Sequence, residues 1–185
     1  MIDKTQIDVL QQRIQLQPTV QFGSGPETLP PPATDSQIAA AERRIGCTLH
    51  KNHRQLLLEV ANGGFGPGYG VVGVDDGFHD PDGGALESSH DLIVSMSDSL
   101  PEGFRFAPLC DWGAAIWSVL SCTDGMVYVF YEGSFYQTND DLTAWISKWL
   151  DNKDIWASMF AFSDTKLPGL PPMKRIASVN GRKVS

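Results

Sequence analysis

The sequence lacks a hydrophobic run long enough to cross a membrane. No stretch approaches the roughly 20 apolar residues that a membrane-spanning helix needs, and the opening segment, residues 1–6, is polar and has no signal-peptide hydrophobic region. We therefore expect a soluble, cytoplasmic protein with no membrane partner. With 185 residues, 42% of them hydrophobic, the chain can bury a core as one domain without a disulfide or a metal ion.

Cysteine is scarce, and the motifs of common metal and nucleotide sites are absent. Cys47, Cys110 and Cys122 form an odd set without a CxxC pair, so the sequence predicts buried free thiols and neither a zinc site nor a disulfide framework. The glycines of residues 68–73 match GxGxxG, but they run into an apolar stretch that we interpret as a strand. A nucleotide site requires this motif to open a helix. We expect no cofactor and no metal.

Basic residues are rare in the middle of the chain. Between Arg54 and Lys148 the single basic residue is Arg105, whereas the same window holds fourteen carboxylates. Residues 1–164 contain nine basic and 22 acidic residues, a net charge of −13, and residues 165–185 contain five basic and no acidic residues, a net charge of +5. An acidic body repels nucleic acid and attracts basic proteins. Solubility alone is the alternative interpretation of this charge.

Hydrophobic spacing predicts helices at both ends of the chain and strands between them. A capping box formed by Thr34 and Gln37 opens one helix, which ends at Gly46. The turn at Asp124-Gly125 joins the two most regular strands. The predicted helices are 3–16, 34–45, 51–61 and about 139–150, the predicted strands are 71–74, 104–106, 115–121 and 126–131, and a long acidic loop is predicted over 75–91.

This order of elements indicates an α+β fold, a single domain whose mainly antiparallel sheet is packed with N-terminal and C-terminal helices. Trp156, Met159 and Phe160 extend or follow the last helix. We expect residues 1–33 to form an N-terminal helix and a proline-rich connector, residues 34–162 to form the domain, and residues 163–185 to form a basic, proline-containing tail.

Residues 34–150 resemble the SUKH superfamily, which includes fungal cell-wall-assembly regulators (Smi/Knr type) and bacterial toxin-immunity proteins. The resemblance rests on a helix that ends at a glycine, a second short helix and an Asn-Gly-Gly turn, then an apolar strand with a glycine turn, a strand pair and a tryptophan helix. His50 stands where family members usually have proline. The residues that carry the first block are Ile38, Glu42, Gly46, Leu49, Leu57, Asn62, Gly63 and Gly64, and the later blocks are 106–113, 127–130 and the tryptophan helix.

The motif residues Glu42, Gly46, Asn62, Gly63, Gly64 and Gly113 are expected to be structural. We predict backbone conformations at Gly46, Gly63 and Gly64 that other residues avoid. Asn62 is expected either to cap the preceding carbonyls or to take a left-handed geometry. Glu42 either bonds to the backbone of the following turn or is a solvated helix residue.

The resemblance implies a non-catalytic protein-binding domain whose variable loops contact other proteins. Our interpretation is an immunity-type protein that neutralises a toxin by direct contact through an acidic surface, and the expected partner is a basic toxin domain. The alternative is a regulatory scaffold that binds several cellular proteins. Trp112 fits an exposed interface contact and a core position equally well. The predicted partner contacts are Asp75, Asp76, Asp80, Asp82, Glu87 and Trp112.

Cys110 and the acidic loop offer an enzymatic and a metal-binding alternative. Cys110 could serve as a nucleophile only if a histidine base lay within hydrogen-bond reach, and its apolar neighbours favour a core thiol. The acidic loop over 75–91 contains oxygen ligands suited to calcium, but it lacks the spacing of an EF-hand, which favours a solvated loop. His53 shares the apolar helix face with Leu57, so we expect it to be a hydrogen-bonded core histidine.

Overall fold

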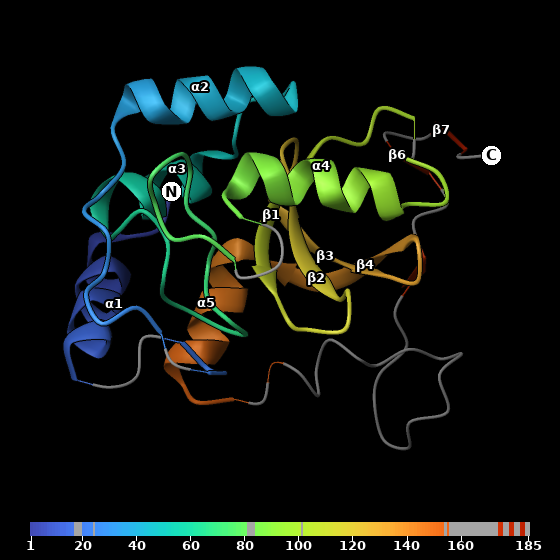
Figure 1. Ribbon diagram of the computed structural model, residues 1–185. Helices are drawn as coiled ribbons and strands as arrows, with labels where there is room; N and C mark the ends of the chain where they lie inside the picture. The colour runs from blue at the N-terminus through green and yellow to red at the C-terminus, as the bar shows by residue number, and fades with distance from the viewer. Residues whose placement is uncertain are drawn as a thin grey trace.

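The elements form an α+β domain, described by a computed structural model over residues 1–16, 20–23, 25–80, 84–100, 102–153 and 155 and the short strands at 174–175, 178–179 and 182–183. Within these residues, helices pack on both faces of an antiparallel sheet, as the sequence predicted (Figure 1). The expectations for Trp156, Met159, Phe160 and Asp82 lie outside the described residues.

Four consecutive strands form the sheet in the order β1-β2-β3-β4. The chain turns back at Asp124-Gly125 between β2 and β3, as predicted, and Trp117 of β2 lies opposite Phe130 of β3. A fifth short strand, β5, lies beside β4, so that this piece of the basic tail pairs with the sheet. The strands are β1 (Phe106–Asp111), β2 (Trp117–Ser121), β3 (Met126–Tyr131), β4 (Ser134–Asp141), β5 (Lys174–Arg175) and a separate pair, β6 (Ser178–Val179) with β7 (Arg182–Lys183).

Local capping signals set the ends of several helices. The Thr34–Gln37 capping box is present at the start of α2, and Gly46 closes that helix with a left-handed φ of 73°. Asp141 caps α5 through a bond from the Ala144 N–H to its carboxylate. The helices are α1 (Lys4–Leu16), α2 (Asp35–Ile45), α3 (Lys51–Glu59), α4 (Leu86–Met96) and α5 (Leu142–Leu150).

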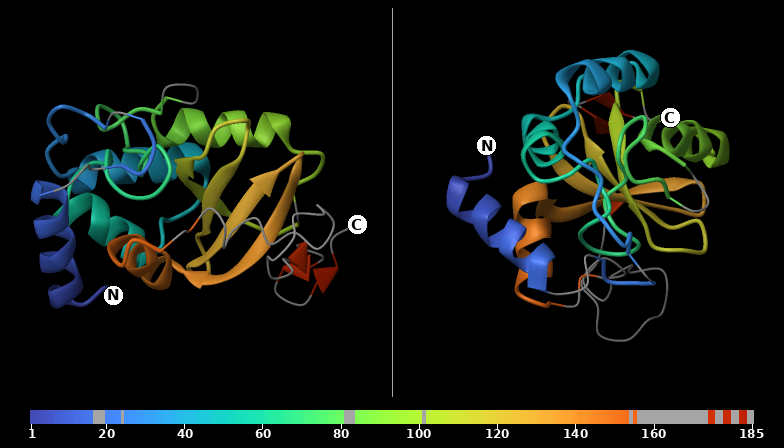
Figure 2. Two further views of the ribbon diagram at one scale, coloured as in Figure 1. Left: turned by 90° about the horizontal axis from the view of Figure 1, so that it is seen from below. Right: turned by 60° about the vertical axis from the view of Figure 1, so that its left-hand side comes forward.

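The sheet separates two hydrophobic cores, because alternate strand residues point to opposite faces. On β3, Val127 and Val129 join a core with residues of α1, α3 and α5, whereas Tyr128 and Phe130 join a core with residues of α2 and α4. Both views in Figure 2 place α4 and α5 on opposite sides of the sheet. The helix α1 belongs to the first core through Ile7 and Leu10, which are 4% and 1% exposed.

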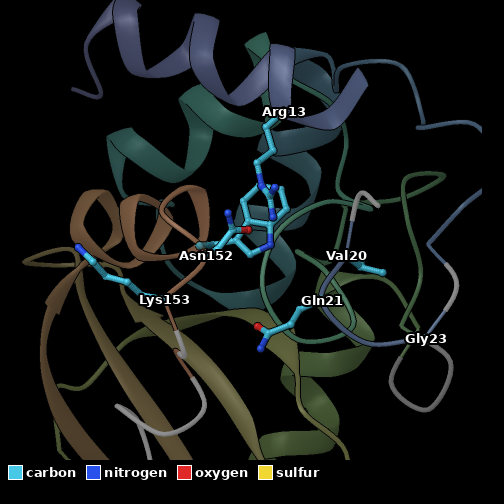
Figure 3. A pocket seen from close by; sticks show the side chains of 7 residues that line it. Arg13, Val20, Gln21, Gly23, Asn152 and Lys153 are labelled. Atoms are coloured by element: carbon cyan, nitrogen blue, oxygen red, sulfur yellow. The ribbon is translucent and has the colours of Figure 1, made fainter. Parts of the chain in front are cut away.

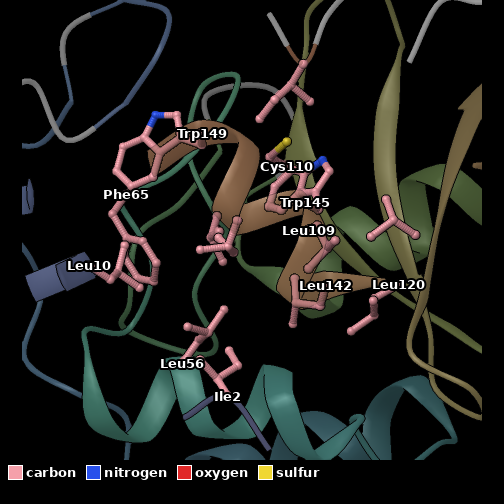
Figure 4. Packing of buried hydrophobic residues seen from close by; sticks show 14 of the residues in the cluster. Ile2, Leu10, Leu56, Phe65, Leu109, Cys110, Leu120, Leu142, Trp145 and Trp149 are labelled. Carbon is pink, nitrogen blue, oxygen red and sulfur yellow. The ribbon is translucent and has the colours of Figure 1, made fainter. Parts of the chain in front are cut away.

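The tryptophans of α5 are core residues, as expected from their spacing. Trp145 and Trp149 are 0% and 4% exposed. In Figure 4, Leu10 from α1 and Leu56 from α3 point into the same interior as Trp145. Three segments distant in sequence therefore share one apolar core, and its burial is a main source of the stability of the domain.

Two sequence predictions about secondary structure are wrong, and one strand was not predicted. Residues 71–74 form no strand, because their backbone bonds go to several separate segments. Val71 bonds Gly64 and Phe65, Gly73 bonds Phe78 and Leu86, and the Val72 N–H donates to Leu109 O of β1. The predicted loop over 75–91 contains the start of α4 at Leu86. The strand β4 was not predicted, because the second half of its sequence is polar and partly exposed. Its composition therefore resembles that of a loop.

Strand β2 begins at Trp117, two residues later than predicted. Ala114 and Ala115 both have positive φ, 52° and 59°, and form the turn between β1 and β2. The Ile116 N–H donates to Gly113 O at 3.0 Å and closes that turn. The apolar alternation therefore predicted the start of the strand two residues too early, because Ala115 belongs to a tight turn whose φ angles are incompatible with a strand.

Candidate functional site

The turn at Asn62 is tied to a loop twelve residues later. The Val74 N–H donates to Asn62 Oδ1 at 2.8 Å, and Asn62 Nδ2 donates to Val74 O at 2.9 Å. The Phe78 N–H also donates to Asn62 O, at 2.8 Å. Asn62 is 3% exposed and has no positive φ. Both roles predicted for Asn62 are therefore wrong: its side chain holds the neighbouring loop, an arrangement that we call the Asn62 clamp.

Glycines make room for the Asn62 clamp. A Cβ atom on Gly73 or Gly77 would lie within 2.8 Å or 2.5 Å of the Asn62 Oδ1 atom, and one on Gly63 would lie 2.5 Å from Val71 O. The φ angles of Gly63 and Gly64 are 82° and 83°, which confirms the predicted left-handed conformations. The Asn-Gly-Gly turn and the segment 71–78 thus pack backbone against backbone.

The clamp presents the tip of the acidic loop to solvent. Asp75 adopts a left-handed φ of 51°, and the Gly77 N–H donates to Val74 O at 2.9 Å across the turn. Asp75 and Asp76 are both exposed, and within the described residues neither forms an ion pair with a lysine or an arginine. His79 Nε2 donates to the Asp75 carbonyl at 2.7 Å. Asp75 and Asp76 are therefore available to a partner.

The other predicted contacts do not share this surface. Asp80 and Glu87 are 3% and 8% exposed, because the Asp80–Gly84 backbone bonds and the first turn of α4 fold this segment against the domain. Trp112 is 3% exposed, so the core alternative holds for this residue. Its indole N–H donates to Ser118 Oγ at 2.9 Å, and the ring meets Phe22 edge-on at 5.8 Å between centroids.

Glu42 links α2 to the next turn and to α3. Its Oε1 atom accepts the Leu49 N–H at 2.8 Å and an Arg54 N–H at 2.8 Å. Of the two roles considered for Glu42, the bond to the backbone of the following turn is the observed one. The Arg54 guanidinium also reaches Asp35 at 2.9 Å, so a small charged network joins the start of α2 to α3.

Sequence reasoning missed a second acidic group at the turn between β3 and β4. The Asp98 N–H donates to Gly133 O at 2.9 Å, so Asp98, which follows α4, lies beside Glu132 in that turn. Both residues are exposed. They are 34 positions apart. The one sequence signal that they share is their place in the acidic stretch between Arg54 and Lys148.

A comparison with protein-family models settles the family of the chain. Residues 32–148, well over half of the sequence, match the SMI1/KNR4 family (SUKH-1). The chain belongs to this family. No curated protein and no solved structure gives a significant match. The family match covers α2 to α5 and the strands between them, and it ends just before Trp149.

The buried thiol of this SUKH-1 domain is poorly suited to catalysis. Cys110 is 0% exposed, and burial raises the pKa of its thiol well above the usual value, with Asp111 adding to the effect. A nucleophilic cysteine needs the opposite shift. Among residues 1–153 that the structure describes, no group of three histidine, cysteine or acidic side chains is arranged to hold a metal ion.

The other two cysteines meet across the fold. Cys47 follows α2 and Cys122 follows β2, and their sulfur atoms lie 2.6 Å apart. Both residues are free thiols, as expected, but they are half-buried and not buried. The hydrogen bond from Cys122 lowers the pKa of Cys47, and the nearby Arg105 acts in the same direction. The pairing was not predictable from sequence, because 75 residues separate the two cysteines.

His53 is buried, as expected, but it is not hydrogen-bonded. It is 0% exposed, and neither ring nitrogen has a partner among the described residues. Burial lowers its pKa to about 4, and the charge of the nearby His50 adds to this effect.

No helix in the described part of the chain is long and apolar enough to span a bilayer.

Proposed function

We propose that this SUKH-1 domain is a non-catalytic, immunity-type protein that neutralises a basic toxin by direct contact through an acidic surface centred on Asp75 and Asp76. The observation that carries the proposal is the exposure of these two carboxylates at a tip that the Asn62 clamp holds in place. A rigidly held tip loses little conformational freedom on binding, which favours affinity.

The surrounding charge supports the same proposal. Residues 55–147 supply fourteen carboxylates and one basic residue, Arg105, whose Nη1 atom already donates to Phe104 O. The resulting field attracts a basic partner over distances of about 10 Å at 0.1 M salt and about 30 Å at 0.01 M salt, which accelerates association more than it slows dissociation. Asp98 and Glu132 contribute a second exposed pair of carboxylates to this field.

The partner is identified first, by capturing proteins on the tagged full-length chain from its own cells and analysing them by mass spectrometry. One stoichiometric basic protein that is released by high salt supports toxin neutralisation. Several weakly bound proteins support the scaffold alternative and contradict the proposal.

The surface is then tested by association kinetics with the purified partner. The double variant Asp75→Asn/Asp76→Asn is expected to slow association several-fold at low salt, with little change in dissociation. The control is Asp8→Asn/Glu59→Gln, which removes the same charge from accessible positions on α1 and α3. Equal association rates for both double variants would exclude the tip as the contact surface.

A further inference from the structure

A pocket of about 350 Å³ lies where α1 and the segment after it approach the end of α5 (Figure 3). In Figure 3 the side chain of Arg13 extends toward the pocket and toward Asn152, while Gln21 lies on the other side of the opening. The lining residues are Arg13, Val20, Gln21, Gly23, Trp149, Asn152 and Lys153.

Every residue that lines the pocket lies outside the family match. Arg13 to Gly23 precede residue 32, and Trp149 to Lys153 follow residue 148. The segments on either side of the family match thus form the pocket. Neither Asp75 nor Asp76 of the acidic tip lines the pocket.

Arg13 supplies a positive charge that the described residues leave unpaired. Its guanidinium carbon lies 4.6 Å from the centre of the Trp149 ring, a cation–π arrangement. Its Nε and Nη1 atoms are shielded from solvent and have no hydrogen-bond partner among the described residues. Buried donors on a charged group cost free energy unless an acceptor satisfies them. Arg13 also lines the pocket, so an anion held there lies against a positive charge that has no other partner among the described residues.

The other polar groups limit the charge of that anion. Lys153 Nζ is already bonded to Asp151 at 2.8 Å, which leaves Arg13 as the main cation. Asn152 has a left-handed φ of 53°, and its N–H donates to Trp149 O at 3.0 Å, so the turn after α5 fixes its position. Gln21 and Asn152 provide neutral amide groups on either side. One cation and two amides match a singly charged, planar group.

We propose that this pocket binds a carboxylate. Arg13 pairs with its charge, the Gln21 and Asn152 amides can donate to its oxygens, and Trp149 forms the apolar wall for the carbon atom that carries it. A free small acid and the terminal carboxylate of a protein chain both present this group, and the experiment distinguishes the two sources.

The test is a titration of the ¹⁵N-labelled full-length chain, observed by NMR at the Arg13 Nε–H and the Trp149 indole N–H. The probes are sodium acetate and the dipeptide acid N-acetyl-Ala-Gly, with N-acetyl-Ala-Gly-amide as the neutral control. We expect saturable shifts with both acids and none with the amide. Tighter binding of the dipeptide acid identifies a chain terminus as the ligand, and equal affinities identify a free acid.

Variants assign the binding to the pocket. Arg13→Gln is expected to lower the affinity for the acids at least about tenfold, and Arg13→Lys to lower it less, because lysine keeps the charge but not the planar donors. Lys4→Gln removes the same charge from an exposed position on α1 and is the matched control. Gln21→Leu keeps the contact between Arg13 and Trp149 and should weaken binding several-fold. This variant tests the pocket even if the arginine variants misfold.

Three results would overturn the proposal. One is the absence of saturable shifts with either acid at high millimolar concentration. Another is equal binding of the neutral amide, which would show that the peptide and not the carboxylate is recognised. The third is binding of inorganic phosphate with no binding of the acids.

Discussion

The Asn62 side chain pairs with both backbone polar atoms of Val74, at 2.8 and 2.9 Å, in a position that is 3% exposed. Each bond replaces a contact with water, and each orphaned buried group costs about 1–3 kcal/mol. Asn62→Ala is therefore expected to lower the free energy of unfolding by about 2–4 kcal/mol, measured by urea denaturation. The control Asn139→Ala alters an exposed asparagine of β4. A loss equal to that of the control would show that the clamp does not stabilise the fold.

The turn between β1 and β2 should be stabilised by glycine. Ala115 has a φ of 59°, which costs an L-residue about 1 kcal/mol relative to glycine. Ala115→Gly is expected to raise the melting temperature by about 2–4 °C. The same change at Ala40, an exposed position within α2, should lower stability by about 1 kcal/mol. The melting temperatures are measured by calorimetry. A change of the same sign for both variants would contradict the left-handed conformation of Ala115.

The domain should lose stability in mild acid through His53. Its pKa is lowered to about 4 in the fold and is about 6.5 in an unfolded chain. Between these two values the unfolded chain binds a proton that the folded chain does not, so the free energy of unfolding decreases as pH falls from about 6.5 to about 4, by at most about 3 kcal/mol. His53→Leu should remove this part of the pH dependence. The free energy of unfolding of both proteins is measured by urea denaturation at each pH. The same pH dependence for both would show that His53 does not cause the loss of stability.

Cys47 and Cys122 should form a disulfide when the protein is treated with diamide. The Cys47 thiolate, favoured by its lowered pKa, adds to a diazene nitrogen. Attack by the Cys122 thiol on the Cys47 sulfur, which lies 2.6 Å away, then releases the hydrazine, so two thiols lose two protons and two electrons to the diamide.

Mass spectrometry of the intact chain and of its tryptic peptides measures this oxidation. The expected result is the loss of two hydrogens in a cross-linked peptide pair that contains Cys47 and Cys122, while Cys110, which is fully buried, stays reduced. Cys122→Ser is the control and should give no internal cross-link. A disulfide that involves Cys110 in the folded wild-type chain would contradict the described packing.

Sequence signals that act over a few residues predicted the fold well. The Thr34–Gln37 capping box and Gly46 set the ends of α2 because their hydrogen bonds and φ angles are local. The spacing of Trp145 and Trp149 predicted a buried helix face, since the period of a helix is itself local. The start of α4 was missed because its serines and histidine are weak helix formers and its first turn follows a glycine-rich loop.

The candidate site was less predictable, because its geometry depends on contacts between distant residues. Burial of Trp112 depends on Phe22, ninety positions earlier in the chain. The role of Asn62 depends on Val74, and the exposed neighbours Asp98 and Glu132 are brought together by a bond to Gly133. Charge composition could indicate an acidic protein, but only the fold separates the exposed Asp75 and Asp76 from the buried Asp80 and Glu87.

The Asn62 clamp bonds to main-chain atoms of Val74 and leaves the side chains at positions 75 and 76 outside its reach. The framework and the tip can therefore diverge at different rates. Positions 63, 73 and 77 are restricted to glycine, because a side chain at any of them would collide with the backbone or with the asparagine. Asp76 has an ordinary backbone conformation, whereas Asp75 has a positive φ that favours aspartate, asparagine or glycine. New binding preferences can therefore arise by single mutations at position 76 without refolding of the scaffold.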